Sequence, residues 1–298
     1  MLTYNEILGI IYLYMIGFGF LGNCILLFLN IFNFLIAHRT KSKSLIIIHL
    51  AFSNIMSLLF RGLPATTRLW RVKCLLDNIG IKIITHIQII TWSLSMGSTC
   101  LLSTFQAISL IPNNSKCSQL KTRTPKFIIL YLLLFWVFNL LLNEVGFLQN
   151  IVPKNITDIN EGCNTGYRRM DVHNKNHMKI IIILCVYDAL FICLMICSSG
   201  YMVLILYRHK KHVRHIHSNS VSIKLSPETR ATLAILFLVC TFVLFNTLSP
   251  IFILYMFHFK YTNNWMIHSS VILSVWYPAV SPFILIIIDN QIPKTCTH

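Results

Sequence analysis

Charged residues are scarce in this chain, and acidic residues are the scarcest. Only 11% of the 298 residues are charged, whereas a soluble domain typically carries about 25%. Because so few charges cannot cover a water-facing surface, an ordinary soluble enzyme is excluded. A hydrophobic share of 55% also excludes a disordered chain. The mean hydropathy of +0.68 indicates a protein that lies mostly in lipid.

Catalytic and metal-binding motifs are also lacking. The sequence has no His-Glu-x-x-His, no glycine-rich phosphate loop, no serine elbow and no paired intramembrane carboxylates. Four histidines lie between 209 and 217, but the Lys and Arg residues among them would repel a metal ion. We interpret that cluster as a basic cytoplasmic face beside anionic lipid or an acidic partner. We therefore expect no metal, no cofactor and no enzymatic activity.

Seven apolar stretches are long enough to cross a bilayer, which takes about 20 helical residues. They cover residues 7–37, 45–66, 83–111, 127–148, 180–207, 231–257 and 265–288. The third stretch is the least apolar, because it is rich in Thr, Ser and Gln. Runs of this length without strict alternation favour helices over a barrel. The sequence therefore predicts an all-α fold, a seven-transmembrane helix bundle that forms one domain over residues 1–298.

Three features predict an extracellular N-terminus and a cytoplasmic C-terminus. In that orientation more than half of the Lys and Arg residues lie on the inner side. The sequon at Asn155 then lies in an outer loop, where we predict glycosylation. Of the ten cysteines, Cys74 and Cys163 are the two in outer loops. We predict a disulfide between them, with two unpaired thiols as the alternative. The net charge of +16 is thus explained by membrane lipid and not by nucleic acid.

Four ionisable residues lie in the outer halves of the predicted spans: Arg61, His86, Glu144 and Asp188. Such residues are costly in lipid and commonly functional. Their predicted depths overlap, so they could surround one outward-open cavity that binds a small molecule. Alternatively, they pair with one another, for instance Arg61 with Asp188 or Glu144, and fix the packing of the helices.

The inner halves of the spans contain small or neutral polar residues, which usually form bridges between helices. These are Asn23, Asn54, Ser103, Gln106, Asn246, Ser249 and Ser281. Pro250 and Pro282 free backbone carbonyls and are expected to kink the sixth and seventh spans. Kinked helices joined by polar contacts can switch between two packings.

Three stretches resemble the vomeronasal type-1 receptors: CLLSTFQAI at 100–108, SPETRAT at 226–232 and SPF at 281–283. The residues at 22–23 and 49–52, Asp188 and the outer loop with Asn155 and Cys163 also fit that family. The Asp-Arg-Tyr and Asn-Pro-x-x-Tyr motifs of most rhodopsin-like receptors are absent, which is typical of the vomeronasal group. Asn54 stands where most rhodopsin-like receptors have a sodium-binding Asp.

This resemblance implies a multi-pass plasma-membrane pheromone receptor. It would bind small organic ligands and activate a heterotrimeric G protein of the inhibitory class. The residues expected to face that G protein are Lys116, Lys121, Arg123, Lys210, Lys211 and Arg230. A bitter taste receptor and a small transporter or channel subunit are the alternatives. The second lacks support because no inverted repeat is visible.

Overall fold

The computed structural model describes residues 3–36, 41–69, 78–111, 118–150, 175–216, 227–259 and 264–289. Within these ranges the regular structure is entirely helical and forms seven continuous stretches, one over each predicted span. They are α1 (Tyr4–Ile36); α2 (Lys41–Ser57), which continues through the π-helical turn η1 (Leu58–Gly62) into α3 (Leu63–Leu69); α4 (Asn78–Ser109); α5 (Ser118–Asn150); α6 (Lys175–Ile216); α7 (Pro227–Phe259); and α8 (Asn264–Asp289).

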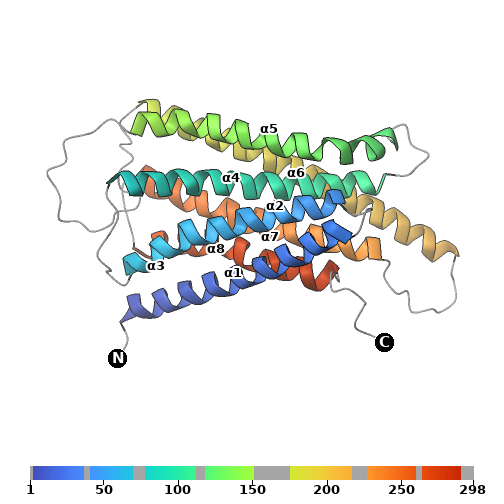
Figure 1. Ribbon diagram of the computed structural model, residues 1–298, viewed down its shortest axis with the longest axis horizontal. Helices are drawn as coiled ribbons and strands as arrows, with labels where there is room; N and C mark the ends of the chain where they lie inside the picture. Colours follow the sequence, from blue (N-terminus) through green and yellow to red (C-terminus); the bar gives the residue numbers. More distant parts are fainter. Residues whose placement is uncertain are drawn as a thin grey trace.

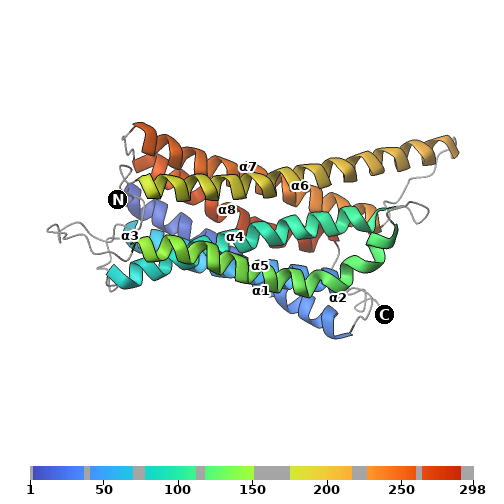
Figure 2. The ribbon, with the colours of Figure 1, turned by 90° about the horizontal axis from the view of Figure 1, so that it is seen from above.

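The helices lie side by side along the long axis of the molecule (Figures 1 and 2). The first turn of α1 and the last turn of α8 lie toward opposite ends of that axis. In the middle of the bundle, α4 packs against α2, α5, α6 and α7, while α1 packs against α2 and α8. The bundle therefore has one central helix and several peripheral ones.

Among the described residues, five helices are long and apolar enough to cross a membrane: Tyr4–Leu35, Ser42–Thr66, Lys126–Asn143, Val186–Arg208 and His268–Ile286. A shorter apolar stretch, Thr232–Phe245, lies in α7. On α5 and α6 only 28% and 11% of the apolar window is buried, and large apolar side chains are exposed there, as lipid contact requires. The central helix α4 is not among the five, which agrees with the expectation that the third span is the least apolar.

The second predicted span is not the plain helix that the sequence predicts, because η1 interrupts it. A π-helical turn holds one extra residue and rotates the rest of the helix by about 100° relative to a regular one. Pro64 offers a physical reason, because it lacks the N–H that would bond the carbonyl of Phe60 in an α-helix. Tight packing also fixes this turn: a Cβ added to Gly62 would lie 2.6 Å from Cγ1 of Ile16 on α1.

Candidate functional site

One wall of the candidate site is built where η1 meets α4. The guanidinium of Arg61 lies over the ring of Trp92, 5.3 Å from the ring centroid, a cation–π arrangement. One turn earlier on α4, the side-chain amide of Gln88 donates a hydrogen bond to the carbonyl of Phe60. This is the carbonyl that Pro64 leaves without its helical donor. The same face of α4 thus contacts two successive residues of η1.

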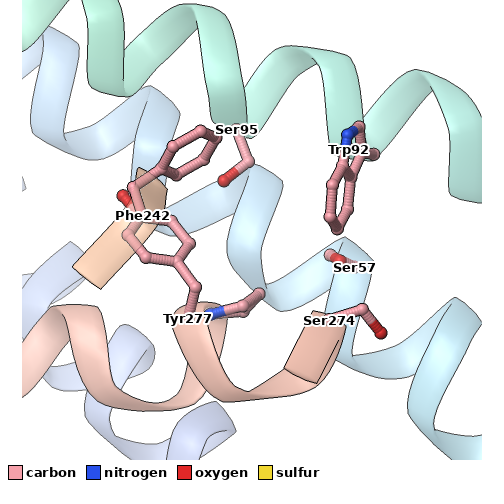
Figure 3. Close-up of a pocket in the computed structure, with 7 residues that line it drawn as sticks. Ser57, Trp92, Ser95, Phe242, Ser274 and Tyr277 are labelled. Atoms are coloured by element: carbon pink, nitrogen blue, oxygen red, sulfur yellow. The ribbon is translucent and has the colours of Figure 1, made fainter. Parts of the chain in front are cut away.

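Trp92 also lines a small cavity in the centre of the bundle, shown in Figure 3. The other lining residues come from α2, α4, α7 and α8 and are Ser57, Ser95, Phe242, Ser274, Tyr277 and Pro278. The cavity volume is about 10 Å³, which is room for at most one water molecule. An organic ligand can therefore enter here only if side chains such as Trp92 move aside.

The four predicted ligand-binding residues lie on four different helical elements. Arg61, His86 and Asp188 are half-buried, on η1, α4 and α6. Glu144 lies in α5, but its side chain is outside the described structure. The structure brings Arg61 against the ring of Trp92, an aromatic contact that the sequence did not reveal. Whether the four residues form one ligand site stays a prediction.

Several further predicted sites fall outside what the structure describes. Four of them lie entirely outside the described residues: Cys74, Lys116, Asn155 and Cys163. Four others lie in helices, but their side chains are not described: Lys121, Lys210, Lys211 and Arg230. Arg123 is described and is exposed in the first turns of α5. Its side chain is therefore accessible to a partner at that end of the helix.

About one turn before the cavity residue Ser57 on α2, Asn54 joins four helices. Its Nδ2 donates to Oδ1 of Asn23 on α1 at 3.3 Å and to Oγ of Ser281 on α8 at 2.9 Å. Its Oδ1 accepts a hydrogen bond of 2.8 Å from Ser95 on α4. All four residues are buried. The bridging role predicted for Asn23, Asn54 and Ser281 is confirmed.

The same cluster supplies a hydrogen-bond donor that the backbone of α8 lacks at Pro282. Pro282 cannot donate to the carbonyl of Pro278, four residues earlier. Nδ2 of Asn23 donates to that carbonyl instead, at 2.8 Å. Close approach of α1 makes this possible: a Cβ on Gly22 would lie 2.7 Å from the ring of Phe283. A side-chain amide from a neighbouring helix thus replaces the missing donor at both Pro64 and Pro282.

From Trp92 toward its C-terminal end, α4 carries a stripe of hydrogen-bonding residues spaced by three or four, which places them on one face. Each bonds a different helix: Ser95 to Asn54 of α2 at 2.8 Å, Thr99 to Tyr277 of α8 at 2.6 Å, Ser103 to Ser198 of α6 at 2.7 Å and Gln106 to Thr232 of α7 at 3.0 Å. The predicted bridges of Ser103 and Gln106 are confirmed. Ser95 and Thr99 were missed, although their spacing from Ser103 was a usable signal. The side chains of Asn246 and Ser249 lie outside the described structure.

A second polar cluster joins α2, α4 and α5 around His49. Nε1 of Trp136 donates to Nε2 of His49 at 2.7 Å, and Nδ1 of His49 lies 2.6 Å from Oγ of Ser98. Because Nε2 accepts, the ring is neutral with its proton on Nδ1, which donates to Ser98. Ser98 in turn donates to the carbonyl of Leu94. The sequence marked His49 only as part of a family motif and did not reveal this bridge.

Comparisons with known proteins agree with this architecture. The model of the vomeronasal organ pheromone receptor family matches residues 6–298. Vomeronasal type-1 receptor 1 of Gorilla gorilla gorilla is 34% identical over 97% of this chain and 82% of its own length. Vomeronasal type-1 receptor 3 of Homo sapiens is 34% identical over 96% of this chain and 92% of its own.

A fish protein is also similar: olfactory receptor class A-like protein 1 of Danio rerio is 29% identical over 94% of this chain and 89% of its own length. The matched family consists of receptors and not of enzymes, and with the membrane-spanning helices it indicates a multi-pass protein of the plasma membrane. The match extends over nearly the whole chain, including the stripe along α4 and the cluster around Asn54. This chain belongs to the vomeronasal organ pheromone receptor family.

Proposed function

We propose that this receptor is a single domain of seven transmembrane helices, with its N-terminus extracellular and its C-terminus cytoplasmic. It binds a small, pheromone-like organic molecule between the outer halves of the helices. It then activates a heterotrimeric G protein of the inhibitory class at the inner ends. Family membership supports the sensory role, and the opposite positions of the first turn of α1 and the last turn of α8 support an odd number of spans (Figure 1).

The stripe along α4 is the observation that carries this proposal. Trp92 lines the cavity, and Gln106 bonds α7, fourteen residues further along the same helix. At 1.5 Å per residue the two lie about 21 Å apart along the axis. A ligand that moves Trp92 thus acts on the helix whose inner end holds α7. It shifts the balance between two packings only if it binds one of them more tightly.

In this proposal Arg61, His86, Glu144 and Asp188 line the outer site. Arg61 stacks on the ring of Trp92, which also lines the cavity. The inner basic residues Lys116, Lys121, Arg123 and Arg230 face the G protein. On the outer side, a Cys74–Cys163 disulfide joins two loops, and Asn155 is glycosylated. Support for these outer features comes from their place in the predicted topology.

The test is nucleotide exchange on an inhibitory-class G protein, in membranes from cells that express the chain, with fractionated small-molecule secretions added. Glycosylation at Asn155 and surface delivery are measured in the same cells. We expect fraction-dependent exchange. Absence of exchange with a glycosylated, surface-delivered protein would contradict the proposal and lead to flux assays for a transporter.

Variants of the outer wall extend the same experiment. Arg61→Ala and Asp188→Asn should shift the effective dose of an active fraction at least tenfold without lowering surface delivery. That is about 1.4 kcal/mol of binding free energy, a size typical of a desolvated charged contact. Leu63→Ala, which alters an exposed residue of the same helical stretch, is the matched control. If Arg61→Ala and Asp188→Asn instead abolish delivery, these residues are structural.

A further inference from the structure

Helix α6 continues well past the membrane-spanning part of the chain. It has 42 residues, so it is about 63 Å long, twice the roughly 30 Å of a bilayer core. Its apolar span ends at Arg208, and the helix goes on to Ile216. Figures 1 and 2 both show this end of α6 extending beyond the neighbouring helices. The extension, residues 208–216, holds four Lys and Arg residues and no acidic residue.

The last turns of the apolar span show which face of α6 meets lipid. Val203, Leu204 and Tyr207 are 54%, 46% and 67% exposed, and Arg208 is exposed as well. On the opposite side, Ser198 and Met202 are buried in the bundle. An exposed tyrosine directly before a basic run is typical of the boundary between the hydrocarbon and the headgroups.

Because α6 is a regular helix, its lipid-facing and bundle-facing sides both continue into the extension. Residues spaced by three, four and seven share a face, so the lipid-facing register of 203, 204, 207 and 208 continues to Lys210, Lys211 and Arg214. The bundle-facing register of 198 and 202 continues instead to 209, 213 and 216, which are histidine, valine and isoleucine. All four cations of the extension therefore occupy the outward register.

We propose that Arg208, Lys210, Lys211 and Arg214 form a binding site for anionic phospholipid headgroups of the cytoplasmic leaflet. The site rests on the topology in the proposed function. It assigns Lys210 and Lys211 to lipid, not to the G protein. A protein partner seated under the bundle meets the bundle-facing register, which carries none of these cations. Basic residues at the edge of a span attract anionic lipid strongly, and cations at the C-terminal end of a helix are further favoured by its dipole.

The first measurement needs neither a ligand nor a G protein. The full chain is reconstituted in phosphatidylcholine vesicles with a trace of spin-labelled phosphatidylserine or spin-labelled phosphatidylcholine. Electron paramagnetic resonance then gives the fraction of each probe immobilised on the protein. We expect about a three- to tenfold preference for the phosphatidylserine probe at low salt. It should fall steeply in 1 M salt, where the Debye length is about 3 Å. Equal association of the two probes would overturn the proposal.

Two variants distinguish the effect of the four charges from the effect of their position around the helix. Arg208→Gln, Lys210→Gln, Lys211→Gln and Arg214→Gln combined should remove most of the preference. A composition-matched variant moves both lysines to the bundle-facing register by two exchanges: Lys210→Val with Val213→Lys, and His209→Lys with Lys211→His. It keeps the net charge and should lose about half of the preference on a logarithmic scale, because two of four cations have moved. Thermal unfolding confirms that both variants remain folded.

Each result decides the matter. A preference that survives neutralisation, or is unchanged in the exchanged variant, overturns the lipid site. If neutralisation abolishes nucleotide exchange but leaves the phosphatidylserine preference unchanged, the surface contacts the G protein and the lipid site is wrong. If the wild type never stimulates nucleotide exchange but shows the salt-sensitive preference, the proposed signalling function fails while the lipid site stands.

Discussion

Helices α4 and α6 differ in what surrounds them: α4 packs against four other helices, whereas most of the apolar part of α6 is exposed. The central helix α4 carries Ser95, Thr99, Ser103 and Gln106, each hydrogen-bonded to a different helix. On α6, by contrast, only 11% of the apolar window is buried, and its outer face presents large apolar side chains. Polar residues in this membrane protein thus lie where a helix contacts other helices. Among the described residues, α6 is apolar enough to count as a membrane span, whereas α4 is not, because buried polar residues interrupt its apolar run.

The strongest way to break this contrast is to enlarge a glycine on each helix. A Cβ on Gly97 of α4 would lie 2.0 Å from the ring of Phe135, a buried residue of α5. Gly97→Val should therefore cost about 3 kcal/mol and greatly reduce surface delivery. Gly200→Val on α6 is the control, because among the described residues no atom outside the adjoining turns of α6 lies within 4 Å of the added Cβ. Equal delivery of the two variants, measured by surface labelling, would show that α4 is not tightly enclosed.

The next largest effect on stability is expected from the loss of Asn54, whose side chain joins α2 to three other helices by hydrogen bonds. Asn54→Leu removes three hydrogen bonds, to Asn23, Ser281 and Ser95. At about 0.6 kcal/mol per intramembrane bond, the free energy of unfolding in detergent should fall by about 2 kcal/mol. Thermal denaturation of the purified receptor measures this. An unchanged midpoint would mean that these bonds are exchanged for equally good ones in the variant.

The smallest effect compares two neighbouring serines on α6. Oγ of Ser198 bonds Ser103 of α4, whereas Oγ of Ser199 is buried without a hydrogen-bond partner among the described residues. Ser198→Ala should destabilise the receptor by about 0.6 kcal/mol. Ser199→Ala should be neutral or slightly stabilising, because it removes an unsatisfied hydroxyl. The reverse order of the two midpoints would remove Ser198 from the set of bridges.

Much of this arrangement could be predicted from the sequence because lipid imposes strict rules. Seven apolar stretches became seven helical stretches, and the neutral polar residues Asn54, Ser103 and Gln106 proved to be bridges. In a membrane a buried amide or hydroxyl has no water to bond. Its role as a bridge therefore follows from its place in an apolar run.

Other features depend on which helices meet, and the sequence does not give this. Pro64 is visible in the sequence, but the π-helical turn beside it also depends on Gln88 of α4 and on the close approach of Ile16. For Arg61 the sequence offered carboxylates as partners, whereas the structure places the ring of Trp92 under its guanidinium. The outward-open cavity was likewise inferred from residue depths, and side chains fill the space beside Trp92 down to about 10 Å³.

The central claim is that buried bridges along α4 hold the bundle in one packing, and the bond between Gln106 and Thr232 tests it most directly. We would measure basal nucleotide exchange on an inhibitory-class G protein for wild type, Gln106→Leu, Thr232→Val and the double variant. With a bond of about 0.6 kcal/mol, each single change should raise basal exchange about threefold. The double variant should do no more than either. Independent, multiplying effects, or no effect of either change, would contradict the claim.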